Sequence, residues 1–460
     1  MTELIYSSVV NQAEQIRRKA ISSVELTKAY LARIKAVNAK LNAVVQLAAE
    51  TALKEATEAD NALAQGNVTG PLHGIPMTIK DSFDTAGIIS TWGTLGRKDT
   101  VPAQDATIVT RLKAAGAILL GKTNTPEFTL NFETNNGIYG RTNNPYNPDR
   151  SSGGSSGGAA ALVASGGISF DIGTDTGGSI RLPAHCCGIA GLKPTSGRVP
   201  RTGHAVDAGS FFDSLTTVGP MARFVDDLSL LFPIIAGPDG RDPFIAPVPI
   251  KEPNTVDIKS LRAIFYTDNG IQTPIPEIMD VVQDVANKLA ETGMPIEEKR
   301  PPGIEESFDL LVTVMRGWDG GANLRALLDK VPTSEDESWL EPADPNTAFS
   351  GIEMVDLIAQ WDRFRMRMLS FMTDYDIIIA PVNAYTAIPH GTLADRYKGF
   401  SYTMTYNLTG WPGVVVRVGT ANDGLPIGIQ VIAKPWREEV SLAVAKHLET
   451  VFGGWQKPTL

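Results

Sequence analysis

Residues 151–158 read SSGGSSGG and run directly into AAALVASGG, so eight consecutive serines and glycines precede an apolar segment. Composition alone favours a flexible linker, because Gly/Ser runs behave as random coil. A Walker phosphate loop fits poorly, because it requires Lys and Ser/Thr where this chain has alanines. The nucleophile-elbow pattern G-x-S-x-G occurs twice, but the turn-forming residues NNPYNPDRSS precede it instead of the strand that an elbow needs.

A second glycine-rich loop, GTDTGGSIR at residues 173–181, follows the apolar run ISFDI. Successive backbone N–H groups at Gly177 and Gly178 can point one way and hold an oxyanion, with Ser179 placed as a nucleophile. A serine hydroxyl needs a base, and none of the five histidines lies in a recognisable catalytic setting. A lysine made neutral by burial is the physical alternative. Lys80, between the apolar MTI and Asp81, is the best candidate by its local sequence.

The two loops and their surroundings resemble the amidase signature family. The run GGSSGGAAALVASGG…GTDTGGSIRLPAHCCGIAGLKPTSGRVPRTG is similar to the defining segment of that family, and PLHGIPMTIKDSFD is similar to its lysine motif. GKTNTPEF, NNPYNP, YNLTGWPGVVVRVG and GLPIGIQVIA resemble further family segments. The resemblance covers most of residues 60–240 and 375–435, and it replaces the linker interpretation of residues 151–158.

The resemblance implies a Ser-cisSer-Lys triad. Ser179 matches the nucleophile, Ser155 the bridging serine that follows a cis peptide bond, and Lys80 the base. The oxyanion hole would be formed by the backbone of Thr176, Gly177, Gly178 and Ser179, with Asp175 and Arg181 supporting the loop. Thr129 and Ser155 fall where such enzymes bind substrate. No cofactor and no metal are implied.

Alternating segments predict an α/β fold. DATIVTRLKAAG and AAALVASGG read as helices, and AILLGKTN and ISFDIGTD as buried strands. Equally buried strand patterns return in YDIIIAPV, GVVVRVG and PIGIQVIA, so we expect one sheet completed by both halves of the chain rather than two domains divided near residue 240. The expected architecture is a single large domain, 1–460, with a central mixed, largely parallel β-sheet covered by helices on both faces.

Within this domain we expect an N-terminal helical segment at 1–66, a signature core at 70–240 and a helical substrate-pocket region at 305–372. The N-terminal segment includes a capping-box pattern that begins at Ser22. Three tryptophans, Trp318, Trp339 and Trp361, are candidates for the walls of the pocket, although ordinary packing is the more frequent reason for such residues.

Net charge and composition limit the classes of partner that we expect this chain to bind. The formal net charge is −10 and no Lys/Arg cluster offsets it, which disfavours nucleic acid and anionic membrane surfaces. The N-terminus has no apolar block of signal-peptide length, and the apolar runs are too short to span a bilayer, so we expect a cytoplasmic protein that is a monomer or homodimer. Cys186 and Cys187 are adjacent and predict two reduced thiols.

The expected function is therefore a serine amidohydrolase that cleaves linear amide bonds of small acyl or aryl amides through an acyl-enzyme, and that also acts on esters and carbamates (urethanes). Two alternatives stay open at this point. One is an amidotransferase subunit of the glutaminase type, which would act on charged tRNA, and the other is a catalytically silent binding protein.

Overall fold

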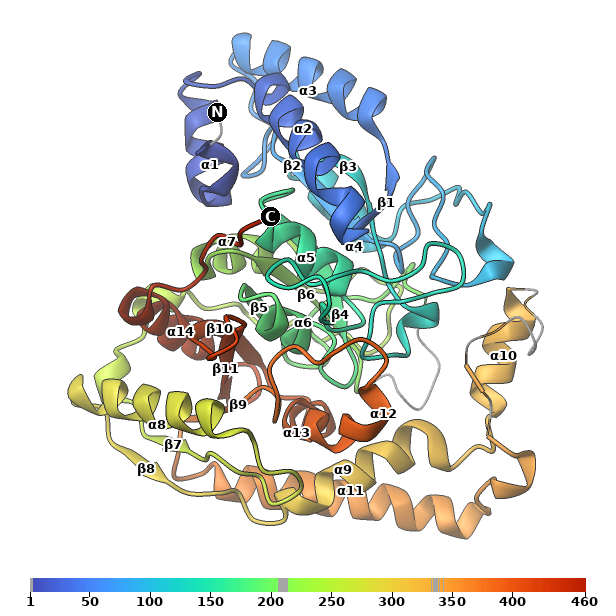
Figure 1. Ribbon diagram of the computed structural model, residues 1–460, viewed down its shortest axis with the longest axis vertical. Coiled ribbons are helices and arrows are strands. Elements are labelled where there is room, and N and C mark those ends of the chain that lie inside the picture. Colours follow the sequence, from blue (N-terminus) through green and yellow to red (C-terminus); the bar gives the residue numbers. More distant parts are fainter. Residues whose placement is uncertain (1–2, 206–213, 332, 334–337, 339, 342) are drawn as a thin grey trace.

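The architecture is built around an eight-stranded sheet to which both halves of the chain contribute (Figure 1). The computed structural model describes residues 3–205, 214–331, 333, 338, 340–341 and 343–460. The strand order is β4-β6-β5-β10-β11-β9-β7-β8. The strands are β4 (Phe170–Asp175), β5 (Ala190–Lys193), β6 (Thr217–Ala222), β7 (Ala263–Phe265), β8 (Ile296–Glu298), β9 (Ile377–Pro381), β10 (Gly413–Thr420) and β11 (Pro426–Ala433). A mixed sheet in one α/β domain is therefore confirmed.

The expectation that this sheet is largely parallel is wrong. The pairs β4–β6, β6–β5, β5–β10, β10–β11 and β11–β9 are antiparallel, whereas β9–β7 and β7–β8 are parallel. Parallel neighbours need a long crossover such as the helix between β7 and β8, but β10 and β11 are joined by a short turn. Burial of a strand is visible in the sequence, and its direction is not.

A separate three-stranded sheet, in the order β1-β3-β2, carries Lys80. Its strands are β1 (Val44–Leu47), β2 (Pro76–Lys80) and β3 (Ile118–Thr123). β1 lies inside the segment 1–66 that was expected to be helical, and it pairs antiparallel with β3. The β-branched Val44 and Val45 suit that edge position better than a helix. In Figure 1 this sheet lies with α2 and α3 in the upper part of the molecule.

The helices of the first half begin with α1 (Val9–Arg17), α2 (Ser23–Leu41), α3 (Ala49–Ala64) and α4 (Thr107–Ala114). The capping box predicted for α2 is confirmed, because Glu25 N donates to Ser22 Oγ while Ser22 N donates to the Glu25 carboxylate. The helices α5 (Gly157–Ala164), α6 (Arg181–Cys186) and α7 (Val225–Ile235) follow the glycine-rich loops and β6.

The helices of the second half are α8 (Pro276–Glu291), α9 (Ser307–Val312), α10 (Ala322–Lys330), α11 (Gly351–Phe371), α12 (Leu393–Arg396), α13 (Ser401–Leu408) and α14 (Glu438–Phe452). Every residue of β9 and β11 is buried, as expected for strands that are covered on both faces. Helices α5 and α6 pack together against the sheet, as do α7 and α14.

Candidate active site

Lys80 ends β2 with a side chain that is fully buried. Its Nζ lies 2.6 Å from Ser155 Oγ, 2.8 Å from Thr174 Oγ1 and 3.0 Å from Ser156 Oγ. Burial lowers the pKa of Lys80 well below its usual value, although the carboxylates of Asp175 and Asp171 oppose the shift. The lysine is therefore surrounded by hydroxyls in a setting that favours a neutral amine.

Residues 151–158, of which Ser155 and Ser156 contact this lysine, are all buried and form no linker. The peptide bond between Gly154 and Ser155 is cis, as the family resemblance implies. Gly158, in the first turn of α5, is required by close approach, because a Cβ there would lie 2.4 Å from Asn124 N. Ser156 N donates to Ser179 O at 3.2 Å, so the two glycine-rich loops meet at the lysine.

The loop 176–180 connects β4 to α6, and several of its carbonyls are hydrogen-bonded. The carbonyls of Gly177, Gly178 and Ser179 accept from Thr403 Oγ1, Leu182 N and Ser156 N. No protein acceptor among the described residues is bonded to the N–H groups of residues 177–179. Gly178 has φ +136°, and a Cβ there would lie 2.2 Å from Thr403 Oγ1.

Asp175 and Arg181 flank this loop and form a fully buried ion pair. Asp175 Oδ2 accepts from Arg181 Nε at 3.0 Å and from the backbone N–H groups of Ile180 and Arg181. Burial alone would raise the pKa of Asp175, but the Arg181 guanidinium lowers it to about 2. Asn407 Nδ2 donates to Asp175 Oδ1 at 2.8 Å, and Arg181 Nη1 donates to Gln430 Oε1 at 3.0 Å. The pair is thereby tied to α13 and β11, far away in sequence.

A small pocket of about 90 Å³ opens onto Ser179. Its lining is formed by Thr129, Leu130, Asn131, Phe132, Thr176, Gly177, Ser179, Met315, Leu393 and Tyr397. Among the described lining residues none carries a charge. The ring of Phe132 stacks on the ring of Phe400, with 4.8 Å between their centroids, and its centroid lies 5.9 Å from that of Tyr397. These rings give the pocket an aromatic wall.

Thr129, which was expected beside the substrate, lines this pocket in an unusual backbone conformation. Phe128 and Thr129 have φ values of 47° and 64°, a region that a β-branched residue rarely adopts. The turn is held by hydrogen bonds from Phe128 N to Trp92 O and from Thr129 N to Pro126 O. Such outliers cluster at functional sites.

Two of the tryptophans proposed as pocket walls, Trp318 and Trp361, are not among the described lining residues. Trp361 is buried in the core and donates its indole N–H to Leu408 O at 2.8 Å, and Trp318 donates to Val314 O. Trp339 lies outside the described residues. From the region 305–372 the lining includes Met315, which lies in the π-helical turn Thr313–Gly317.

Several site residues escaped the sequence reasoning. Ser156 and Thr174 contact Lys80 as Ser155 does, but their roles depend on loop packing. Asp171 is fully buried on β4, where Oδ2 accepts from Thr78 Oγ1 at 2.6 Å and from Thr123 Oγ1 at 3.0 Å. Burial raises the pKa of Asp171 to about 6. An aspartate inside the apolar run ISFDI was the available clue, because a charge in a buried strand needs a reason.

The amidase family model matches residues 25–442 of this sequence. The chain belongs to the amidase signature family. Its relatives include an acylamidase, an indoleacetamide hydrolase and a peptide amidase, and the chain is an amide-hydrolysing enzyme. It is 32% identical over 485 residues to an acylamidase of Rhodococcus erythropolis, with 98% of this chain and 97% of that protein covered.

Two further proteins similar to this amidase have names that denote different activities. It is 37% identical over 485 residues to a glutamyl-tRNA(Gln) amidotransferase subunit of Roseiflexus sp. (strain RS-1), with 98% of this chain and 97% of that protein covered. The solved structure of a 6-aminohexanoate cyclic dimer hydrolase in complex with its substrate superposes with a TM-score of 0.87 at 27% identity, with 97% of each chain covered. In the described part of this amidase, no helix is both long enough and apolar enough to cross a membrane.

Proposed function

We propose that this amidase is a serine hydrolase that cleaves the C–N bond of small, uncharged acyl or aryl amides through an acyl-enzyme on Ser179. One observation carries the proposal: the fully buried Lys80 Nζ lies 2.6 Å from the hydroxyl of Ser155. Ser156, the residue after Ser155, donates its backbone N–H to Ser179 O. Lys80 is the base, Ser155 the proton relay and Ser179 the nucleophile.

The burial of Lys80, which lowers its pKa, supports a neutral base, and the three hydroxyls around Nζ can satisfy one. A neutral amine has two N–H donors and one lone pair, and three hydroxyls surround Nζ. Ser156 Oγ and Thr174 Oγ1 accept the two N–H donors. The lone pair then faces Ser155 Oγ, the nearest of the three, and accepts its proton.

The chemistry proceeds in two balanced halves. As Ser155 passes its proton to Lys80, it takes the proton of Ser179, whose Oγ bonds to the carbonyl carbon of the substrate. The N–H groups at 176–179 stabilise the oxyanion, because no protein acceptor among the described residues competes for those of residues 177–179. The proton returns along the relay to the leaving nitrogen as the C–N bond breaks, and water then releases the acyl group by the reverse path.

The uncharged pocket favours hydrolysis of neutral amides over the glutaminase alternative. Free glutamine carries both an ammonium and a carboxylate, and burying these charges without partners is costly. The described lining of the pocket offers them no opposite charge. Activated esters and carbamates pass through the same oxyanion, so they belong to the proposed substrate range.

A fluorophosphonate probe tests the assignment of the nucleophile. The parent protein should be labelled, and Ser179→Ala should lose the label together with amide hydrolysis. Ser196→Ala is the matched control, because the buried Ser196 Oγ makes no hydrogen bond among the described residues. A Ser179→Ala protein that hydrolyses a benzamide or an anilide at the parental rate would refute the proposal. Faster turnover of glutamine than of every neutral amide would favour the amidotransferase role.

A further inference from the structure

Helix α11 has two apolar faces, although only one of them contacts the core. Leu357, Trp361, Phe364 and Met368 are buried, and the Trp361 indole donates to Leu408 O. The opposite face carries Ile352, Val355, Ile358, Met366 and Leu369, which are 43–77% exposed. These are five of the eleven large apolar side chains exposed among the described residues. In Figure 1 the helix runs along the lower rim of the molecule.

The outer face has the spacing of a coiled-coil seam. Positions 352, 355, 359, 362, 366 and 369 alternate by three and four residues, and they hold Ile, Val, Ala, Asp, Met and Leu. Such a 3.5-residue period keeps one stripe facing a partner helix. A core-facing helix of a monomer needs one apolar stripe, and the second stripe is left exposed among the residues that the structure describes.

The stripe is also self-complementary in the antiparallel direction. Opposing two copies of α11 about a two-fold axis between residues 360 and 361 sets Ile352 against Leu369 and Val355 against Met366 toward the ends, and the small Ala359 against Asp362 at the centre. The same axis places Asp356 beside Arg363 of the second copy, and symmetry repeats that pair. A two-fold interface requires this self-complementarity.

The charges of α11 select the direction of pairing. Its first half carries Glu353 and Asp356, whereas Arg363, Arg365 and Arg367 crowd its second half, with Asp362 as the one acid there. Antiparallel packing therefore sets an acidic half against a basic half, and parallel packing would set like charges together. We propose that the exposed stripe of α11 is a homodimer interface, in which α11 packs antiparallel on α11 of a second copy.

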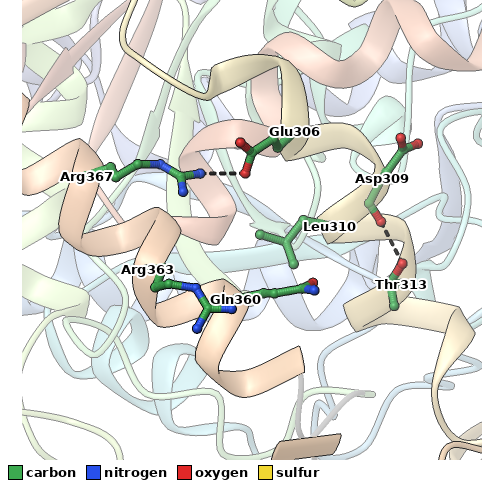
Figure 2. A pocket seen from close by; sticks show the side chains of 7 residues that line it. All are labelled: Glu306, Asp309, Leu310, Thr313, Gln360, Arg363 and Arg367. Atoms are coloured by element: carbon green, nitrogen blue, oxygen red, sulfur yellow. Dashed lines mark hydrogen bonds and ion pairs between the residues drawn. The ribbon is translucent and has the colours of Figure 1, made fainter. Parts of the chain in front are cut away.

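The helix is held so that this stripe stays outward. Arg367 Nη2 donates to the Glu306 carboxylate beside a groove of about 400 Å³ (Figure 2). Gln360 and Arg363 line the same groove, on the flank of the stripe. Because the buried face contacts Leu408 and the flank is tied to Glu306, α11 cannot rotate to bury its outer residues.

Sedimentation velocity over a wide concentration range tests the dimer. We expect a reversible monomer–dimer equilibrium that Val355→Glu and Met366→Glu each shift toward monomer, raising the dissociation constant by at least about tenfold. Val101→Glu is the matched control, because Val101 is similarly exposed and lies elsewhere. A parent protein that is monomeric at every concentration overturns the proposal, as does a dimer that neither α11 variant weakens.

Cysteine cross-linking tests the direction of pairing in the full-length protein. Both native cysteines are buried, so introduced thiols are the accessible ones among the described residues. Under mild oxidation, a mixture of Val355→Cys and Met366→Cys proteins should form a covalent dimer, and neither variant should do so alone. Cross-linking of either variant alone would overturn the antiparallel arrangement. Sedimentation of a monomeric parent with anionic phospholipid vesicles, abolished by Val355→Glu, would assign the stripe to a lipid surface instead.

Discussion

Replacement of Lys80 by methionine should change how the stability of this protein depends on pH. Lys80 is fully buried, and its pKa in the folded state is lowered well below 10.5. At pH values between this lowered pKa and the ordinary pKa of the unfolded state, the folded state therefore holds one proton fewer than the unfolded state. A state that binds more protons is favoured as pH falls, so the free energy of unfolding rises with pH across this window. One proton corresponds to about 1.4 kcal/mol per pH unit.

The parent protein should therefore gain stability over Lys80→Met with this slope of about 1.4 kcal/mol per pH unit within that window. The measurement is urea denaturation of both proteins at matched pH values, with the difference in unfolding free energy plotted against pH. Lys54→Met, at an exposed position, is the control and should show no such slope. Parallel stability curves for the parent and Lys80→Met would show that Lys80 titrates alike in both states, and the proposed base would fail.

The same substitution tests the chemistry. Loss of the base should lower kcat/KM for a neutral amide by about 10⁴-fold or more, which corresponds to about 5 kcal/mol of transition-state stabilisation. In the parent protein, kcat/KM should rise with pH as Lys80 loses its proton. A Lys80→Met protein with parental kcat/KM would contradict the relay through Ser155.

Three further substitutions probe the support of the site. Arg181→Met should lower the free energy of unfolding at neutral pH by about 3–5 kcal/mol, because the buried carboxylate of Asp175 would lose the cation of its ion pair; urea denaturation measures the loss. Asp171→Asn should move the acidic limb of the pH profile of kcat/KM to lower pH, because it removes an anion that raises the pKa of the active-site lysine; an unmoved limb would reduce this carboxylate to a structural role. Gly178→Ala should lower kcat by about 100-fold or more, because its Cβ would displace Thr403 or the amides of the loop; unchanged steady-state kinetics would argue against the oxyanion hole.

The glycine-rich segments and the lysine could be located from the sequence because their local patterns are dense. Buried-strand runs placed β3, β4, β9, β10 and β11, and the capping box placed the start of α2. The family resemblance then paired Lys80 with Ser155 and Ser179, and the structure places Lys80 Nζ and Ser155 Oγ within hydrogen-bond distance. Each of these inferences uses residues that are neighbours along the chain or belong to one recognisable motif.

Strand direction, the edge strand β1 and the uncharged pocket were decided only by the tertiary structure. Lys80 reaches Thr174 across 94 positions, and Arg181 reaches Gln430 across 249. Hydrophobic periodicity reports which residues are buried, but it carries no information about which buried segment meets which. The amino-acid sequence thus determined the chemical groups and their local backbone. Long-range packing decided which residues surround Lys80 and lower its pKa, because desolvation and hydrogen bonding depend on neighbours in space and not along the chain.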